Sequence, residues 1–290
     1  MHHPHVLNRR QLVLLGTALL AGCEKKVTSP SREGVDVGEK SWATKMVPAE
    51  QIEAAGGQQY AQMMRQAAAK NALAPATDPQ LLRLRAIASR IIPLTPPWNE
   101  RARQWRWEVN LIYSAQLNAF CMPGGKIAFF YGILEKLKLS DDEVAMIMGH
   151  EIAHALREHA RERMGKSVAT DGAIQLGAAV LGLGNMGQYL ANMGGQLLKL
   201  TYSRSDESEA DLVGMELAAR AGYNPAAGVS LWEKMAAAAK GAPPQWLSTH
   251  PTGSTRISDI RSNLARVQGL YDKAPKPPQR FEIAPPFKKP

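Results

Sequence analysis

The sequence predicts a mainly helical α+β fold with one small sheet of about three strands. Two observations support this prediction. Most of the chain after residue 48 carries helical signals, whereas residues 105–113 alternate with the two-residue period of a strand and precede two apolar segments joined by a Pro-Gly-Gly turn. The length of 290 residues and the hydrophobic content of 45% are typical of a globular protein with one or two domains.

The N-terminus has the pattern of a lipoprotein export signal. Arg9 and Arg10 precede the run LVLLGTALLAGC, whose apolar core of about ten residues is too short to span a bilayer. The run ends at Cys23 in Leu-Ala-Gly-Cys, which resembles the cleavage box of bacterial lipoproteins. We expect residues 1–22 to be removed as a signal peptide and Cys23 to carry the lipid. The alternatives are an uncleaved anchor and a cysteine that occurs there by chance.

The residue after Cys23 is Glu24 rather than an aspartate, which resembles the choice that sorts Gram-negative lipoproteins to the outer membrane. We therefore expect the periplasmic face of the outer membrane, with the inner membrane as the alternative. Both the Sec and the twin-arginine export routes stay open. The formal charge of +9 favours anionic lipid, and because no nucleic-acid-binding motif accompanies it, nucleic acid is not an expected partner.

Cysteine usage and composition set the expected domain boundaries. Cys121 is the only cysteine besides the predicted lipid attachment site, so we expect no intrachain disulfide and a small buried side chain at this position. Residues 23–47 are polar and are predicted to form the lipidated end and a tether. Residues 48–272 are expected to form one folded domain, and the Pro- and Lys-rich residues 273–290 are expected to be disordered.

The first half of the domain combines helices with the predicted sheet. Helical signals begin near Pro48, and a further helix follows Asp78, which fits the N-cap, and Pro79, which fits the first helical position. The alternation over 105–113 predicts a strand with one buried face. Residues 117–134 then predict two apolar strands around the Pro-Gly-Gly turn.

The second half of the chain is predicted to be helical. Ser140 and Glu143 form a capping-box pattern at the start of a helix that runs into residues 149–160. Residues 172–198 are uncharged and rich in glycine, and we expect a pair of packed helices there, with a mobile flap or a membrane-dipping segment as alternatives. Further helices are predicted over 205–221, from Asn224 onward and after Pro251.

Residues 149–160, GHEIAHALREHA, carry the HExxH pattern of a zinc site. His150 and His154 are i and i+4 on a helix, so both imidazoles can face one metal ion. Glu151 lies about 100° further round and can accept a proton from a water at the metal. Zinc lowers the pKa of such a water to about 7, so a carboxylate is a sufficient base at neutral pH. The alternative is a chance match, but the predicted cap gives the motif its helical context.

The chain offers few histidines for a third ligand. One zinc-protease design places a glycine and then a third histidine after the motif, but Arg157 and Ala160 occupy those positions here. His159 lies about 140° round the helix from His154, so we expect it at the surface or behind the site rather than on the metal. Three other histidines belong to the predicted signal peptide: His2, His3 and His5.

A second helix offers carboxylates instead. Glu207 and Asp211, in YSRSDESEADLVG, are i and i+4 on one face. Glu207 can bind zinc, and Asp211 can accept a hydrogen bond from the free ring nitrogen of a ligand histidine. Gly214 and Ala218 continue this face with small side chains that would allow close packing against the HExxH helix. The alternative is a solvated acidic helix start that is stabilised by the helix dipole.

Three segments, GHEIAHAL, SRSDESEAD and STHPTGSTRI, occur in an order that resembles the zinc metallopeptidase family of the CaaX-prenyl endopeptidase, HtpX, LoiP and BepA. The resemblance covers about residues 50–270 and implies a gluzincin-like protease with the small sheet beside the HExxH helix and one Zn²⁺ per chain. By this resemblance Glu207 is the third ligand beside His150 and His154, and Asp211 supports a ligand. The chain lacks the repeat domain of BepA and the multiple spans of HtpX, so it resembles the compact LoiP type most.

The same resemblance places His250, in STHP, near the metal. There it would either stabilise the negative charge that forms during catalysis or bind zinc as a fourth ligand in a latent state; the plainer interpretation is a position near a helix N-terminus. Arg204 and Arg256 also match family positions, and we expect them to form ion pairs. The predicted hairpin resembles the family's strands beside the cleft, where an extended substrate could add as a further strand.

Two functions are compatible with these motifs. The first is a lipid-anchored zinc metalloendopeptidase that cleaves misfolded or unassembled envelope proteins, with Glu151 as the general base. The second is a lipoprotein chaperone or assembly factor that keeps a latent zinc site and acts with the envelope assembly machinery. A purely structural zinc is disfavoured, because such sites are usually rich in cysteine and need no adjacent carboxylate base.

Overall fold

The computed structural model describes residues 33–179, 197, 200–239, 245–251 and 255–287, and the side chains of 171–179 are left out of the description. The described helices and strands, in chain order, are α1 (Ala49–Ala69), α2 (Pro79–Ile91), β1 (Glu108–Ile112), β2 (Ala119–Met122), β3 (Lys126–Phe130), α3 (Tyr131–Lys136), α4 (Asp141–Leu156), α5 (His159–Ala179), α7 (Arg204–Arg220), α8 (Ala227–Ala238), α9 (Gln245–Thr249) and α10 (Arg256–Lys273). Short 3₁₀ helices add η1 (Trp42–Met46), η2 (Ile92–Leu94) and η3 (Glu100–Arg103). The mainly helical α+β prediction with a three-stranded sheet is therefore confirmed.

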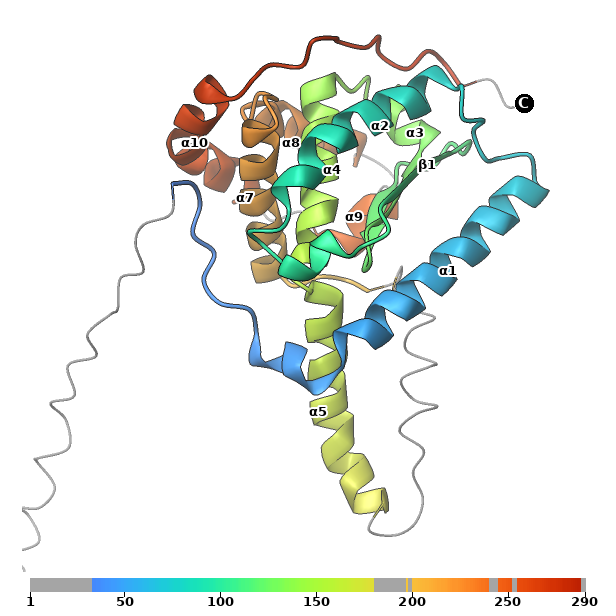
Figure 1. The fold of residues 1–290 in the computed structure, drawn as a ribbon, viewed down its shortest axis with the longest axis vertical. Helices are drawn as coiled ribbons and strands as arrows, with labels where there is room; N and C mark the ends of the chain where they lie inside the picture. The colour runs from blue at the N-terminus through green and yellow to red at the C-terminus, as the bar shows by residue number, and fades with distance from the viewer. Residues whose placement is uncertain (1–32, 180–196, 198–199, 240–244, 252–254, 288–290) are drawn as a thin grey trace, which may run out of the picture. The chain divides into compact units, whose positions relative to one another are not determined.

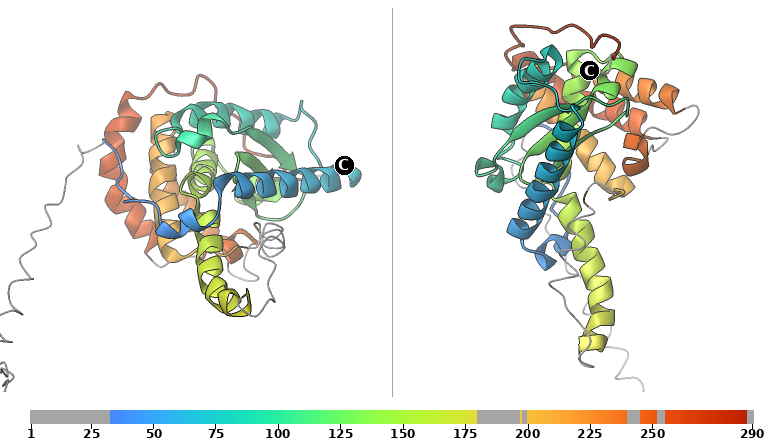
Figure 2. Two further views of the ribbon diagram at one scale, coloured as in Figure 1. Left: turned by 60° about the horizontal axis from the view of Figure 1, so that its bottom comes forward. Right: turned by 90° about the vertical axis from the view of Figure 1, so that its right-hand side faces the viewer.

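Helix α4, which carries the HExxH segment, lies at the centre of the fold. Figure 1 shows α7, α8 and α10 on one side of α4 and the sheet on the other. Contacts with α2, α7, α8 and β2 surround the helix, and every residue from Val144 to Leu156 is buried. A helix that is buried on all sides belongs to the core. The far end of α5 instead projects away from this group of helices in both views of Figure 2.

The predicted helix starts are confirmed by their caps. One carboxylate oxygen of Asp78 accepts hydrogen bonds from two backbone N–H groups in the first turn of α2. The Ser140 hydroxyl accepts from the Glu143 backbone N–H while the Glu143 carboxylate accepts from the Ser140 N–H, which completes the capping box of α4. Ser203 and Asp206 form a second capping box at α7. This second box was not predicted, although its Ser-x-x-acid pattern is the same signal.

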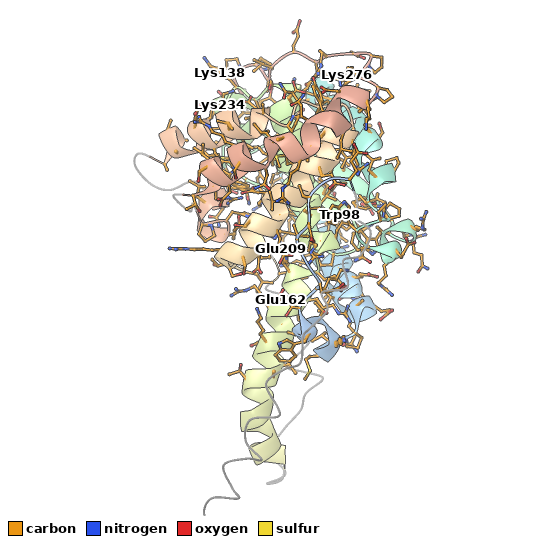
Figure 3. All side chains as sticks on the ribbon, turned by 90° about the vertical axis from the view of Figure 1, so that its left-hand side faces the viewer. Trp98, Lys138, Glu162, Glu209, Lys234 and Lys276 are labelled. Carbon is orange, nitrogen blue, oxygen red and sulfur yellow. The ribbon has the colours of Figure 1, made fainter. Side chains whose placement is uncertain are left out.

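Helix α8 is hydrogen-bonded to the start of α4. The Lys234 ammonium donates to the Glu143 carboxylate at 2.7 Å and to the Lys138 carbonyl at 3.0 Å, and Figure 3 shows the two lysines close together. Burial raises the pKa of Glu143, but hydrogen bonds from Lys234, the Ser140 backbone and Ser230 together outweigh burial, and the pKa is lowered. The charged carboxylate therefore holds the first turn of α4 at neutral pH, which fixes the helix that carries the motif.

The sheet has the order β1-β3-β2. Strands β2 and β3 form the predicted antiparallel hairpin, and its turn contains Gly124 and Gly125 at φ of 85° and 77°, a region that favours glycine. Strand β1 pairs with β3 in parallel. Among the described residues, strand β2 is thus an edge strand, and it lies against α4. This arrangement brings an edge strand of the described sheet next to the HExxH helix.

The close approach of α7 to α4 depends on two glycines. A Cβ atom added to Gly149 would lie 2.6 Å from the Gly214 carbonyl oxygen, and one added to Gly214 would lie 2.6 Å from the His150 backbone nitrogen. Neither distance is compatible with a side chain, so both positions exclude any larger residue. The expectation that Gly214 permits close packing against the HExxH helix is confirmed.

The segment before α1 differs from the expected tether. Val35 is buried and its N–H donates to the Glu216 carboxylate at 2.9 Å. The Arg157 guanidinium binds the carbonyl oxygens of the next residues, Gly38 and Glu39, at 3.1 Å each. Residues 33–47 therefore pack on the helices, because the buried side chains of Arg157, which follows α4, and Glu216 of α7 form hydrogen bonds with this backbone.

The segment after α10 also differs from the expected disorder. The Phe281 N–H donates to the Asp141 carboxylate at 2.9 Å, and the Tyr131 hydroxyl donates to the Pro285 carbonyl at 3.2 Å. The Phe287 ring packs on Tyr131 with ring centroids 5.3 Å apart. Composition mispredicted residues 274–287 because one aromatic ring and a backbone carbonyl find a partner on α3, and a backbone N–H finds one at the acidic start of α4.

Two expectations fall outside the described residues. Cys23 and the whole predicted signal peptide lie there, as does most of the glycine-rich stretch 172–198, whose first residues continue α5. Within the described parts of the chain, none of the helices is both long enough and apolar enough to span a membrane.

Candidate metal centre

Four side chains from three parts of the fold converge at the middle of α4. His150 and His154 come from α4, Glu207 from the first turn of α7, and His250 follows α9. Each offers one ligand atom, and these atoms all lie within 4.8 Å of one another. The four residues are at most 4% exposed. The structure thus brings the HExxH helix together with the carboxylate of Glu207 and the imidazole of His250. These two residues lie far from the HExxH helix in the sequence.

The distances within this group suit a single bound cation. The Nε2 atoms of His150 and His154 are 3.1 Å apart, and His250 Nδ1 lies 3.2 Å from His150 Nε2. Glu207 Oε1 lies 3.0 Å from His250 Nδ1 and 3.4 Å from His154 Nε2. Imidazole nitrogens and a carboxylate oxygen are the ligands that Zn²⁺ takes in proteins. The residues present therefore fit a zinc ion, which would satisfy the converging lone pairs together.

The outer ring nitrogens of the two helix histidines are also held. His150 Nδ1 lies 3.0 Å from Asp211 Oδ1, as expected from the sequence for a supporting carboxylate. His154 Nδ1 lies 2.9 Å from His159 Nδ1, and His159 Nε2 lies 3.4 Å from Glu209 Oε2. Such contacts fix the tautomer and the orientation of a metal-binding imidazole. His159 is buried, so its expected surface position is wrong and its expected place behind the site is right.

Arg256 binds both acidic residues of α7. Its guanidinium reaches Glu207 Oε2 at 2.5 Å and the two Asp211 oxygens at 2.6 Å each. Burial raises the pKa of Asp211, but the charge of Arg256 together with hydrogen bonds from His150 and Arg256 outweighs burial, and the pKa is lowered. Burial likewise opposes ionisation of Glu207, yet hydrogen bonds from His154 and His250 hold its pKa well below the usual range. Both carboxylates are therefore anionic at neutral pH.

Of the two arginines expected in ion pairs, Arg256 forms them and Arg204 does not pair within the described residues. Arg204 is exposed at the first position of α7. Figure 3 shows Glu209, which pairs with Arg157 at 2.8 Å, on the surface where α7 meets α4. Glu209 is not one of the four residues that could bind a metal.

Glu151 lies beside the four converging residues without joining them. It is 2% exposed, and His250 Nε2 is 3.6 Å from its Oε1 atom. The Trp246 indole N–H donates to the same oxygen at 2.6 Å. The carboxylate thus stands next to the position of a bound metal, where a general base has to be.

Two aromatic residues complete the site, and neither was predicted from the sequence. Tyr202 stacks on His154 with ring centroids 3.9 Å apart, and Trp246 stacks on His250 with ring centroids 4.7 Å apart. Trp246 precedes His250 by one helical turn, a spacing visible in the sequence that could have identified it. Tyr202 lies in a segment without periodicity, so only the fold reveals its position.

A hollow borders the site on the side of the sheet. It is lined by residues 118–123, which include all of β2, together with Glu151, Tyr202 and His250. Because β2 is an edge strand in the described part of the chain, its backbone could pair with an extended ligand.

Comparison with known proteins gives a consistent result. The model of the family described as "Peptidase family M48" matches residues 82–264. The mitochondrial metalloendopeptidase OMA1 of Schizosaccharomyces pombe is 34% identical over 197 residues, which are 67% of this chain and 56% of that protein. The metalloprotease LoiP of Escherichia coli is 30% identical over 158 residues, 53% of this chain and 62% of that protein.

A relative with broader coverage is the beta-barrel assembly-enhancing protease of Yersinia pestis, which is 26% identical over 269 residues. These residues are 88% of this chain and 52% of that protein. The chain thus spans about half the length of several of the curated relatives that it matches.

Proposed function

The chain belongs to peptidase family M48, and on that basis we propose that it is a zinc-dependent metalloendopeptidase. One observation carries the proposal. The buried group of His150, His154, Glu207 and His250 offers four converging ligand atoms, and a fifth buried residue, Glu151, lies beside it with its carboxylate within 3.6 Å of His250. Metal ligands and an adjacent base in a site that borders an edge strand are the parts that peptide-bond hydrolysis needs.

In this proposal His150, His154 and Glu207 hold the zinc ion. Zinc, when bound, supplies a Lewis acid and makes a water more acidic. The Glu151 carboxylate removes a proton from the attacking water and later passes it to the leaving amine. Asp211 holds the His150 ring through Nδ1, and Arg256 keeps Asp211 and Glu207 in place.

The position of His250 leaves two roles to be separated by experiment. Its Nδ1 atom lies among the converging ligand atoms, which fits a fourth ligand that closes the site. Its Nε2 atom faces Glu151, which fits a donor to the developing negative charge once the ring turns away from Glu207. A catalytic zinc site needs an open position, so the first arrangement corresponds to a latent enzyme.

We further propose that Cys23 carries a lipid and that the enzyme works at the periplasmic face of the outer membrane. The export-signal pattern at Arg9, Arg10 and Cys23 supports this location. Relatives named LoiP and beta-barrel assembly-enhancing protease support an envelope role, whereas other relatives are named as mitochondrial enzymes. Misfolded or unassembled envelope proteins are the proposed substrates, because an unfolded chain can extend along β2.

The Glu151→Gln variant tests the catalytic proposal. It keeps the shape of the side chain and removes the base, so zinc content should stay at one ion per chain while cleavage of casein falls by at least about 100-fold. Casein cleavage by Glu151→Gln at the wild-type rate, with zinc bound, would refute the role of Glu151.

A binding role is the second candidate, and the placement of His250 among the ligand atoms favours it. In that case the protein would act as a chaperone or assembly factor with a closed zinc site. Complementation of an envelope defect in cells that lack the protein separates the two functions. Full rescue by Glu151→Gln supports binding, and failure to rescue supports proteolysis.

A further inference from the structure

Trp246 contacts the proposed catalytic base from inside the core. Its indole Nε1 donates a hydrogen bond of 2.6 Å to Glu151 Oε1, and both side chains are nearly fully buried. We propose that Trp246 is a positioning residue, whose N–H group fixes the carboxylate of Glu151 in the orientation needed for proton transfer. The proposal rests on the proposed endopeptidase function, and it concerns a residue outside the metal-binding group.

The donor chemistry of the indole determines which oxygen acts as the base. An indole N–H can only donate, so it engages a carboxylate oxygen that carries no proton. Within the described residues, Oε1 of Glu151 accepts the hydrogen bond from Trp246 and lies 3.6 Å from His250 Nε2, whereas no hydrogen-bond donor contacts Oε2. Oε1 is therefore held by the protein, and Oε2 is left for the proton of the attacking water. A base fixed in this way needs no reorganisation during the reaction.

Trp246 is itself held from several sides. Its backbone N–H donates to the Leu117 carbonyl, just before β2, at 3.1 Å. Its ring contacts both His250, with centroids 4.7 Å apart, and Trp232 of α8, with centroids 5.2 Å apart. A side chain that packs on two rings and donates hydrogen bonds from both its indole and its backbone has little freedom, and this is the support that a catalytic group needs.

Trp232 connects Trp246 to the residues that hold the ligands. The Arg256 guanidinium lies 3.6 Å from the centre of the Trp232 ring, and the same guanidinium binds Glu207 and Asp211. The base and the α7 carboxylates are thus connected through one continuous series of contacting side chains. Trp246 also lies one turn before His250, whose N–H donates to the Trp246 carbonyl at 2.9 Å. A shift of α9 that displaces His250 would therefore also displace Trp246 and change its hydrogen bond to Glu151.

A phenylalanine at this position separates the positioning role from simple packing. Trp246→Phe retains an aromatic ring next to His250 and Trp232 but lacks the N–H donor. Trp107→Phe is the matched control, because the Trp107 indole donates to the Ala102 carbonyl at 3.2 Å, away from the site. Both variants lose one indole hydrogen bond, and only one of these bonds involves Glu151.

For Trp246→Phe we expect kcat on a fluorogenic peptide to fall about 10- to 100-fold, with KM within about twofold of wild type and one zinc ion per chain. Trp107→Phe should keep the wild-type kcat and zinc content. An unchanged kcat in Trp246→Phe at full zinc content overturns the proposal. The proposal is also overturned if kcat falls equally in Trp107→Phe. The same holds if the fall in kcat is proportional to a loss of bound zinc or of thermal stability.

A second readout does not depend on activity. In the metal-free, ¹⁵N-labelled full chain, the indole resonance that is absent in Trp246→Phe should shift when Glu151 is replaced by glutamine, because a charged acceptor becomes a neutral one. A resonance that does not move refutes the hydrogen bond, whatever the activity. The wild-type protein could also bind zinc without cleaving peptides while the resonance shifts in Glu151→Gln. That result would contradict the endopeptidase function but would still establish the contact between Trp246 and Glu151.

Discussion

At the residue scale, the two ring nitrogens of His150, and likewise those of His154, have different roles. One nitrogen of each faces the proposed zinc position, and the other contacts Asp211 in the case of His150 and His159 in the case of His154. The ligands are therefore oriented by the fold before a metal binds. Pre-oriented ligands lose less conformational entropy on binding, which raises the affinity for the metal.

The Asp211→Asn variant tests this support. The asparagine keeps the size of the side chain but removes the charge that Arg256 and His150 share, so zinc affinity should fall by about 10- to 100-fold. Competition with a chromophoric chelator measures the change. Asp272→Asn, an exposed substitution on α10, is the control and should bind zinc like wild type. Equal affinity in the two variants would contradict a supporting role for Asp211.

The sequence predicted part of this residue-level arrangement. Helical spacing was sufficient to put His150 and His154 on one face and Glu207 and Asp211 on another. Spacing could not show that His159 turns inward, because the chain changes direction between α4 and α5 at Glu158, which has a φ of 61°. Tyr202 was missed for the same kind of reason, since its contact to His154 is formed between elements.

At the scale of elements, the site depends on the distance between α4 and α7. These helices carry His150, His154 and Glu207, and they meet through Gly149 and Gly214. The close packing at Gly214 and the hairpin turn at Gly124 and Gly125 could be predicted from the sequence. Glycine has no side chain to hold two helices apart, and it readily adopts the positive φ of a tight turn. The parallel pairing of β1 with β3 could not be predicted, since it is set by the crossover and not by any local pattern.

The Gly214→Ala variant tests the helix contact. Its new methyl group would lie 2.6 Å from the His150 backbone nitrogen, so α7 must move and the free energy of unfolding should fall by about 1–3 kcal/mol. Urea unfolding of the metal-free chain measures this. In the control Gly57→Ala, on α1, the methyl group enters open space, and stability should rise by up to about 1 kcal/mol. A Gly214→Ala variant as stable as Gly57→Ala would refute the tight contact.

At the scale of the whole molecule, the described chain is a helical protein built around one buried helix, with its terminal segments packed on the outside. The helices and the hairpin were predictable because their signals are local: caps, spacing and turn residues. The boundaries near residues 47 and 273 were not, because residues 33–47 and 274–287 are held by specific contacts, among them those to Glu216, Arg157 and Tyr131, that composition does not report.

One zinc ion, held at the meeting of α4 and α7, is proposed to make this chain a peptidase. The most direct test is a titration of the metal-free full chain with Zn²⁺ while casein cleavage is followed. We predict no cleavage without zinc, and a rate that rises with added zinc and levels off at one ion per chain. Undiminished cleavage by the metal-free chain, or no cleavage when one zinc ion is bound per chain, would contradict the proposed function.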